Sequence, residues 1–218
     1  MDIKAKFTGD WKIFVNGIMA GVFIGIAGTV YLAVPIPIVG AFLFGFGLLT
    51  ILCNNFKLFT GAVGYLASQG RNTPAYLWTL ALIWGGNLLG CFAVGTAMRY
   101  SRVAVLSGIV AKAQTICAAK TADSWSSLLI LAFFCGILMY LAVDTFKREL
   151  PPVIRLINVF LCVMVFILSG FEHCIANMYY FSAAAVWNWD TLLMVLVMTL
   201  GNSLGGMLLP ACEKIRQF

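Results

Sequence analysis

The chain has 218 residues, of which 62% are hydrophobic and only 10% carry charge, and its formal net charge is +6. A soluble domain carries about 25% charged residues, so the composition excludes an ordinary soluble domain. Apolar runs of roughly 20 residues, the length that crosses a bilayer, predict an integral membrane protein. In such a protein the positive charge reflects topology, and it indicates neither nucleic acid nor an acidic protein as a partner.

Hydropathy predicts six membrane spans, in chain order at residues 12–34, 37–68, 75–98, 126–146, 152–186 and 190–212. The second and fifth are long, and each contains an interruption. The first run is too long for a signal peptide, so we expect it to be a real span. Residues 99–125 are more polar and predict a loop with some helix. The whole chain, 1–218, is therefore expected to be one all-α transmembrane domain.

Basic residues predict the orientation. With the N-terminus inside, nine fall on the cytoplasmic side: Lys4, Lys6, Lys12, Arg71, Lys147, Arg148, Arg155, Lys214 and Arg216. Four fall outside: Arg99, Arg102, Lys112 and Lys120. Because cytoplasmic loops carry an excess of Lys and Arg, both termini are predicted to be cytoplasmic. The four outer charges are either simply solvated or concentrate anions at an outer vestibule.

A weak internal duplication relates the two halves of the chain. Gly86-Asn87-Leu88-Leu89-Gly90 resembles Gly201-Asn202-Ser203-Leu204-Gly205, and Asn87 and Asn202 are 115 residues apart. The same offset relates Gly21 to Gly136 and makes the interruptions of the two long spans coincide. The motifs also have a simpler interpretation, since small residues let membrane helices pack closely.

The predicted repeats, 12–98 and 126–212, are joined by 99–125. Three spans per repeat is an odd number, so the halves must insert with opposite topology. Inverted repeats with broken helices mark the substrate site of many transporters, near the bilayer midplane. Broken helices free backbone groups that hydrocarbon does not satisfy, so they persist only where they line a cavity or are buried in protein.

Polar side chains interrupt both long spans, and polar groups inside a span suggest function. The second contains Asn54-Asn55-Phe56-Lys57-Leu58-Phe59-Thr60-Gly61, and the fifth contains Ser169-Gly170-Phe171-Glu172-His173-Cys174-Ile175-Ala176-Asn177. His173 is the only histidine, and inside a membrane break it predicts proton or anion handling. Lys57 and Glu172 occupy equivalent places, so we expect them near a pseudo-two-fold axis, where pairing would lower the cost of burying both.

The seven cysteines form no Cys-x-x-Cys pair, and most fall inside apolar runs. Free cysteine behaves as a small hydrophobe. A metal or redox site would need partner histidines, so we expect no metal and no cofactor. A membrane-embedded enzyme would need clustered ligands or a nucleophile with a base, and we expect none.

At these residues the chain resembles the formate/nitrite transporter family over nearly its whole length. Leu58-Phe59-Thr60 matches the family's loop in the broken second helix, and Gly170 to Met178 matches the loop in the broken fifth helix closely. Ala20-Gly21-Val22-Phe23-Ile24 and Leu141-Ala142-Val143 agree with the first and fourth spans. Within the family, the chain looks most like the bacterial hydrosulfide channels.

The resemblance implies an aquaporin-like homopentamer in the inner membrane, with a pore in every protomer. It implies an outer constriction of Leu58 and Phe166, and an inner one of Phe44, Leu48 and Phe59. It places Thr60 and His173 between them, with Lys120 near the pore. We expect Glu172, Lys57 and Asn177 to support the site. The family usually has an Asn where this chain has Gly136, which removes a polar partner near Lys120. It commonly has an acidic residue where this chain has Lys57.

These features predict a passive or proton-linked channel for small inorganic or carboxylate anions of weak acids. Hydrosulfide ranks above formate and nitrite. The alternative is an aquaporin-like channel for neutral solutes, but the chain lacks paired Asn-Pro-Ala loops. A weak acid crosses an apolar ring at lower cost as the neutral molecule. His173, with an unperturbed pKa of about 6.5, either donates the proton or orients the anion.

Overall fold

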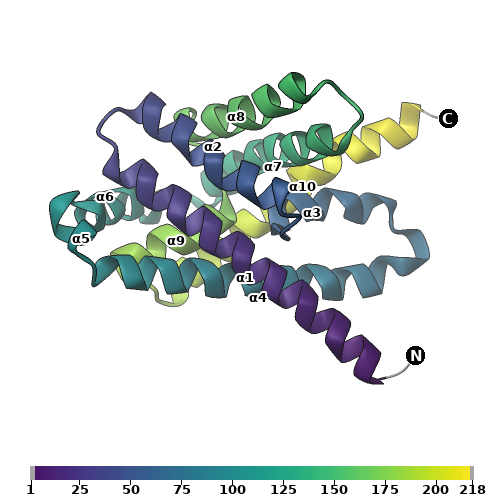
Figure 1. Cartoon of the computed structure of the whole chain (residues 1–218), viewed down its shortest axis with the longest axis horizontal. Helices are drawn as coiled ribbons and strands as arrows, with labels where there is room; N and C mark the ends of the chain where they lie inside the picture. The colour runs from purple at the N-terminus through teal and green to yellow at the C-terminus, as the bar shows by residue number, and fades with distance from the viewer. Residues whose placement is uncertain (1–2, 217–218) are drawn as a thin grey trace.

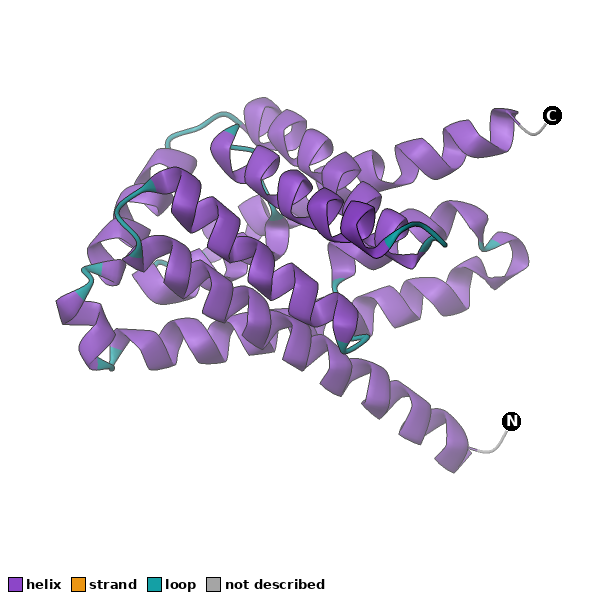
Figure 2. Ribbon diagram, turned by 45° about the horizontal axis from the view of Figure 1, so that its top comes forward, coloured by secondary structure: helices purple, strands orange, loops and turns teal. Residues whose placement is uncertain are grey.

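The computed structural model describes the backbone of residues 3–216 and the side chains of residues 8–216, so the side chains of Lys4 and Lys6 lie outside the described part. That part is helical, as the sequence predicts (Figures 1 and 2). The helices are α1 (Ile3–Ala33), α2 (Pro37–Cys53), α3 (Phe59–Ala62), η1 (Val63–Ser68), η2 (Gly70–Asn72), α4 (Thr73–Arg99), α5 (Arg102–Leu106), α6 (Ile109–Thr121), α7 (Trp125–Lys147), α8 (Pro152–Leu168), α9 (Cys174–Ala184) and α10 (Trp189–Arg216).

The outer surface of this bundle is apolar. Helices α1, α4, α7 and α10 each contain a stretch long and apolar enough to cross a membrane, and α2 and α8 are shorter apolar helices. Large side chains such as Phe42, Phe46, Phe92 and Leu161 are exposed along them. Apolar surface of this extent is rare on soluble monomers and suits contact with lipid. The helices therefore make this a membrane protein.

Helices α2 and α8 stop inside their predicted spans by the same backbone motif. Asn55 and Gly170 take left-handed conformations, with φ of 58° and 70°. The next amide folds back one turn, from Phe56 to the Ile51 carbonyl and from Phe171 to the Phe166 carbonyl, each at 2.9 Å. This pattern ends helices and favours Gly or Asn at the left-handed residue. The chain then runs extended before α3 and α9 begin.

A buried asparagine holds the first break in place. The Asn87 Nδ2 donates to the carbonyls of Gly17 (2.8 Å) and Lys57 (2.9 Å). Its Oδ1 accepts from the backbone amide of Phe59 at 2.9 Å. A backbone carbonyl or amide left unpaired in hydrocarbon costs several kcal/mol. The side-chain amide of Asn87 therefore makes the break possible.

Asn202 repeats the same three bonds at the second break. Its Nδ2 donates to the carbonyls of Ala132 (2.7 Å) and Glu172 (2.8 Å), and its Oδ1 accepts from the amide of Cys174 at 2.9 Å. Each partner lies 115 residues after its counterpart at Asn87. The hydrogen bonding of the two breaks is therefore duplicated, and the glycine-asparagine motifs supply its centre.

The close packing of α7 on α10 requires glycine at position 136. A Cβ added there would lie 2.2 Å from the Asn202 carbonyl oxygen, and one added at Gly21 would lie 2.3 Å from that of Asn87. Both contacts are far below van der Waals distance, so neither position has room for a side chain. The sequence interpretation that Gly136 marks a missing polar partner of Lys120 is therefore replaced by a packing requirement.

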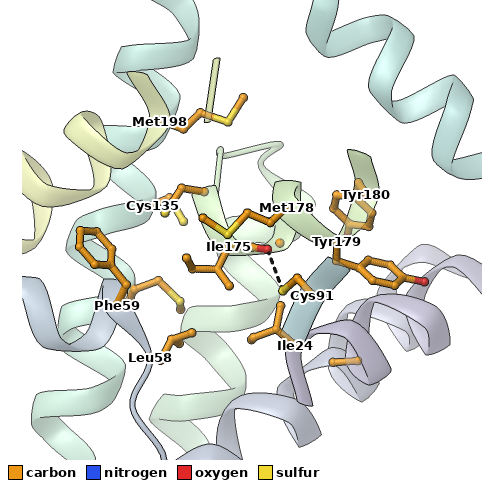
Figure 3. Close-up of a cluster of buried hydrophobic side chains, with 14 of the residues drawn as sticks. Ile24, Leu58, Phe59, Cys91, Cys135, Ile175, Met178, Tyr179, Tyr180 and Met198 are labelled. Atoms are coloured by element: carbon orange, nitrogen blue, oxygen red, sulfur yellow. Dashed lines mark hydrogen bonds between the residues drawn. The ribbon is translucent and has the colours of Figure 1, made fainter. Parts of the chain in front are cut away.

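Helix α9 forms the centre of the core, and every one of its residues is buried. In Figure 3 its residues Ile175 and Met178 lie among Cys91, Cys135 and Phe59. The Cys91 thiol donates to the Ile175 carbonyl at 3.4 Å. The cysteines of the described chain are free, and five of the seven are buried, in keeping with their interpretation as small hydrophobes.

The bundle has two distinct ends. Both termini approach one end, and α5 and α6 lie at the other (Figure 1). We call these the termini end and the α6 end. Residues 99–125, expected to be a loop with some helix, are mostly helical in α5 and α6, and α6 packs beside α9.

Candidate functional site

A polar pair lies where the two breaks meet. The Thr60 hydroxyl, at the start of α3, lies 2.9 Å from Nε2 of His173. Thr60 is fully buried and His173 is 2% exposed. The two residues are 113 positions apart in the sequence. The structure thus brings together the two groups that the sequence predicted to handle the anion.

The backbone determines which imidazole nitrogen carries the proton. His173 is the N-cap of α9, and its Nδ1 accepts a hydrogen bond from the Ala176 amide at 3.0 Å. A neutral imidazole has one donor and one acceptor nitrogen, so the hydrogen is on Nε2 and is donated to Thr60. The Thr60 hydroxyl hydrogen then has no acceptor within hydrogen-bond distance among the described residues. It is available to a ligand.

A cavity of about 160 Å³ opens beside this pair toward the α6 end. His173, Lys120, Asn177 and Phe166 contribute to its lining. The Phe166 ring stacks on the His173 ring with centroids 5.5 Å apart. It also meets the edge of the Phe44 ring at 5.9 Å. Two aromatic side chains therefore lie together on the α6 side of the histidine.

Glu172 pairs with Lys120, at distances of 2.5 and 2.7 Å from Nζ to the two carboxylate oxygens. Its Oε2 also accepts from the Asn177 amide at 2.8 Å. The Glu172 side chain is 6% exposed and that of Lys120 is 15% exposed. The predicted pairing of Lys57 with Glu172 is therefore wrong. The carboxylate bonds a lysine brought in by α6.

A second cavity, of about 500 Å³, opens toward the termini end. Leu58, Ile51, Gly61 and Val143 give it an apolar wall, and Lys57 lies beside them. Leu58 was expected beside Phe166, but the two side chains line different cavities. His173 lines the first cavity, and Leu58, two residues before Thr60, lines the second.

The two constrictions stay a prediction, and the structure shows which of the apolar residues assigned to them lie together. Phe44 was assigned to an inner ring with Leu48, yet it contacts Phe166. Leu48 lies four residues further along α2, about 6 Å along the helix axis. Leu48 and Phe59 are buried, at 1% and 6% exposure. The α6-side group is Phe44 with Phe166, and Leu58 belongs to the termini side.

Sequence reasoning did not assign Asn87 and Asn202 a positioning role. Both are fully buried, and each fixes the backbone next to the site, at Phe59 and at Cys174. The signal was present, since an asparagine recurs inside two predicted spans of apolar helix, where a polar side chain is costly.

Comparison with known proteins places the chain in a family. Residues 2–214 match the formate/nitrite transporter family. Among relatives, the nitrite transporter NirC of Escherichia coli (strain K12) is 28% identical over 216 residues, covering 91% of this chain and 79% of the relative. The probable formate transporter of Methanothermobacter thermautotrophicus is 26% identical over 239 residues, covering 96% and 86%.

Solved structures share the fold. A pentameric formate channel with formate bound aligns with a TM-score of 0.83 and 24% identity, over 96% of this chain and 98% of that one. An ion channel of the same family aligns with a TM-score of 0.83 and 23% identity, over 98% and 92%. This chain belongs to the formate/nitrite transporter family.

Proposed function

We propose that this protein is a channel for small monovalent anions of weak acids. The observation that carries the proposal is the buried Thr60–His173 hydrogen bond, which lies between two cavities that open toward opposite ends of the bundle. Because the family is one of transporters, the protein is a transporter and not an enzyme. The nature and class of the transported ion are our proposal.

In this proposal, apolar side chains on both sides of the Thr60–His173 pair select which solutes cross the channel. Phe44 and Phe166 narrow the α6 side, and Leu48, Leu58 and Phe59 narrow the termini side. A bare charge transferred from water into such surroundings loses most of its hydration, so hydrated metal ions and large solutes are rejected. A small weak acid crosses as the neutral molecule or as a partly dehydrated anion.

His173 acts in this proposal by orientation. Its Nδ1 is occupied by the Ala176 amide, so a second ring proton would break the N-cap of α9. The neutral ring instead donates through Nε2 and directs the Thr60 hydroxyl hydrogen to the passing anion. The Lys120–Glu172 pair and the Asn177 amide support the α6-end cavity, and Lys57 faces the other one.

We further propose six spans in two inverted repeats, assembled as a homopentamer in a bacterial inner membrane. The duplicated bonds of Asn87 and Asn202 support the repeat. The position of both termini at one end (Figure 1) is in keeping with an even number of crossings. The excess of basic residues at that end supports cytoplasmic termini. The similarity in fold to a pentameric formate channel supports the pentamer.

Hydrosulfide, formate and nitrite are the candidate ions. The preference for hydrosulfide now depends on overall resemblance and on Lys57, since packing explains Gly136. Relatives of the chain are named for nitrite and formate. All three ions are small, monovalent and derived from weak acids, which is the class that the site suits.

Uptake of the three ions into proteoliposomes between pH 5 and 8 tests the proposal. Thr60→Val keeps the shape of the side chain but removes the hydroxyl, and we expect a roughly tenfold lower rate, equal to the loss of one hydrogen bond of about 1.4 kcal/mol. Thr60→Ser, the matched control, keeps the rate within about twofold.

His173→Asn separates the two tasks of the histidine. Asparagine is a good N-cap and keeps an acceptor for the Ala176 amide, but it lacks Nε2. We expect normal assembly with strongly reduced transport. If wild type moves glycerol or water but none of the three ions, the channel carries neutral solutes and the proposal is wrong.

A further inference from the structure

The termini-end cavity has three basic side chains in its lining. Lys57 comes from the extended segment after α2, Lys147 from the last turn of α7, and Arg155 from the first turn of α8. No Asp or Glu is among the residues that line it. The cavity therefore holds positive charge without a lining counter-charge.

None of these three cations forms an ion pair within the described residues 8–216, where the salt bridges are those of Lys120 and Arg148. Glu149, two residues after Lys147, takes part in none of these bridges, and Asp144 lies one turn before Lys147 on α7. Its Oδ1 already accepts from the hydroxyls of Tyr65 and Tyr140, at 3.2 and 3.3 Å, and its Oδ2 accepts from Nε of Arg148 at 2.7 Å.

The basic groups are held by aromatic rings and the backbone instead. The Lys147 Nζ lies 4.4 Å from the centroid of the Tyr65 ring. The Arg155 guanidinium lies over Phe146 and donates to its carbonyl at 3.5 Å, while its Nε is buried without a hydrogen-bond partner. A buried donor without a partner is uncommon in folded proteins and indicates that a further acceptor belongs in this cavity.

We propose that the termini-end cavity is a binding site for a small multivalent oxyanion, held by Lys57, Lys147 and Arg155, with inorganic phosphate as its simplest occupant. Ammonium and guanidinium groups form strong charge-assisted bonds with phosphate oxygens. Lys57 and Lys147 lie in one cavity wall, where like charges repel each other, and a bound anion relieves that repulsion.

Charge and size favour a multivalent ion over a monovalent one. Coulomb attraction to the three cations doubles for a dianion. The cavity, at about 500 Å³, has room for phosphate with several water molecules. A doubly charged ion does not continue past Leu58 and the buried Phe59, because dehydration of that charge is too costly. The ion therefore stays at this mouth and occupies it.

Residues of α1, α2, α4, α7 and α8 all contribute to the wall of the cavity, so helices from both halves of the chain surround it. The proposed occupant is therefore a soluble ion that enters from the termini end. The site does not depend on which ion crosses the channel. Its binding is measured without transport, so failure of this proposal and failure of the proposed function give different results.

Calorimetric titration of inorganic phosphate into the purified protein, in low salt and a detergent without phosphate, tests the site. We expect one phosphate per protomer in wild type. In Lys57→Gln/Lys147→Gln the affinity falls at least about tenfold, and in Lys57→Gln alone it falls less. Arg71→Gln/Arg216→Gln, which removes the same charge from exposed positions outside the cavity, retains wild-type affinity.

Formate and chloride serve as monovalent probes and should bind at least about tenfold more weakly than phosphate. The proposal is overturned if wild type binds no phosphate at millimolar concentration. It is equally overturned if the two double variants bind alike, or if formate binds as tightly as phosphate. Thermal unfolding and the pentamer elution volume verify that each variant is folded.

Discussion

The two ends of the bundle share one backbone scaffold but differ in electrostatics. At the α6 end, the Lys120 ammonium meets the Glu172 carboxylate, and the charges cancel. At the termini end, Lys57, Lys147 and Arg155 line a cavity that has no carboxylate in its wall. Lys57 and Glu172 occupy equivalent positions of the duplicated chain, yet they carry opposite charges. The same hydrogen-bond pattern at the two breaks therefore accompanies two cavities of different charge.

The largest expected effect is a loss of stability, and it tests whether the two helix breaks are held by asparagine in the same way. Asn87→Leu and Asn202→Leu each remove three buried hydrogen bonds and leave one carbonyl and one amide of an extended break without their partner. At about 1–3 kcal/mol for each unpaired group, we expect either variant to lose about 2–6 kcal/mol of unfolding free energy. Unfolding in denaturant measures it. Unequal losses, with one variant close to wild type, would show that the breaks are not held alike.

The next effect concerns the paired end. Lys120→Met leaves the Glu172 carboxylate, whose side chain is 6% exposed, with the Asn177 amide as its remaining side-chain partner. Removing one partner of a buried ion pair costs about 3 kcal/mol, so the melting temperature should fall clearly. Lys120→Met/Glu172→Gln should recover at least half of the loss. No recovery would mean that Lys120 acts through packing alone.

At the other end, Lys57→Met should leave stability within about 0.5 kcal/mol of wild type, because it breaks no ion pair and relieves repulsion. Its effect is on ion entry. Clefts lined by one sign of charge concentrate counter-ions, so we expect formate entry from the termini side to slow about threefold at low salt. The difference should vanish near 1 M salt, where the Debye length is about 3 Å. A rate change that persists at high salt contradicts this account.

The last effect is at the surface of the termini end. Arg148 bonds Asp144 and Glu213, at 2.7 and 2.8 Å, but its side chain is 52% exposed. Exposed ion pairs contribute about 0–1 kcal/mol, so Arg148→Ala should change the unfolding free energy by less than about 1 kcal/mol. The contrast with Lys120→Met isolates the effect of burial. An equal loss in both variants would contradict it.

Features carried by short segments could be read from the sequence. Hydropathy located the long helices, because apolar length is a local property. The interruptions at Asn55 and Gly170 agree with positive φ angles, which Asn and Gly tolerate best. His173 was identified because polar groups inside apolar runs are conspicuous, and Thr60 was assigned through the resemblance to the family. The glycine-asparagine motifs indicated a duplication, although the bonds made by Asn87 and Asn202 were not foreseen.

Contacts between distant segments were decided by the tertiary structure. Glu172 bonds Lys120 because α6 packs beside α9 and carries that lysine to the break, 52 positions away. Equivalence in a repeat does not bring two residues together unless both lie on its axis, and Lys57 faces the opposite end. Phe44 of α2 meets Phe166 of α8 because those two helices pack against each other.

The sequence by itself determined a helical membrane protein with two broken spans and a polar residue at each break. Only the tertiary structure decided which charges are paired, which cavity each apolar side chain lines, and which imidazole nitrogen carries the proton. The physical reason is range. Hydropathy and backbone conformation act within one segment, whereas ion pairs and cavity walls depend on how separate helices pack.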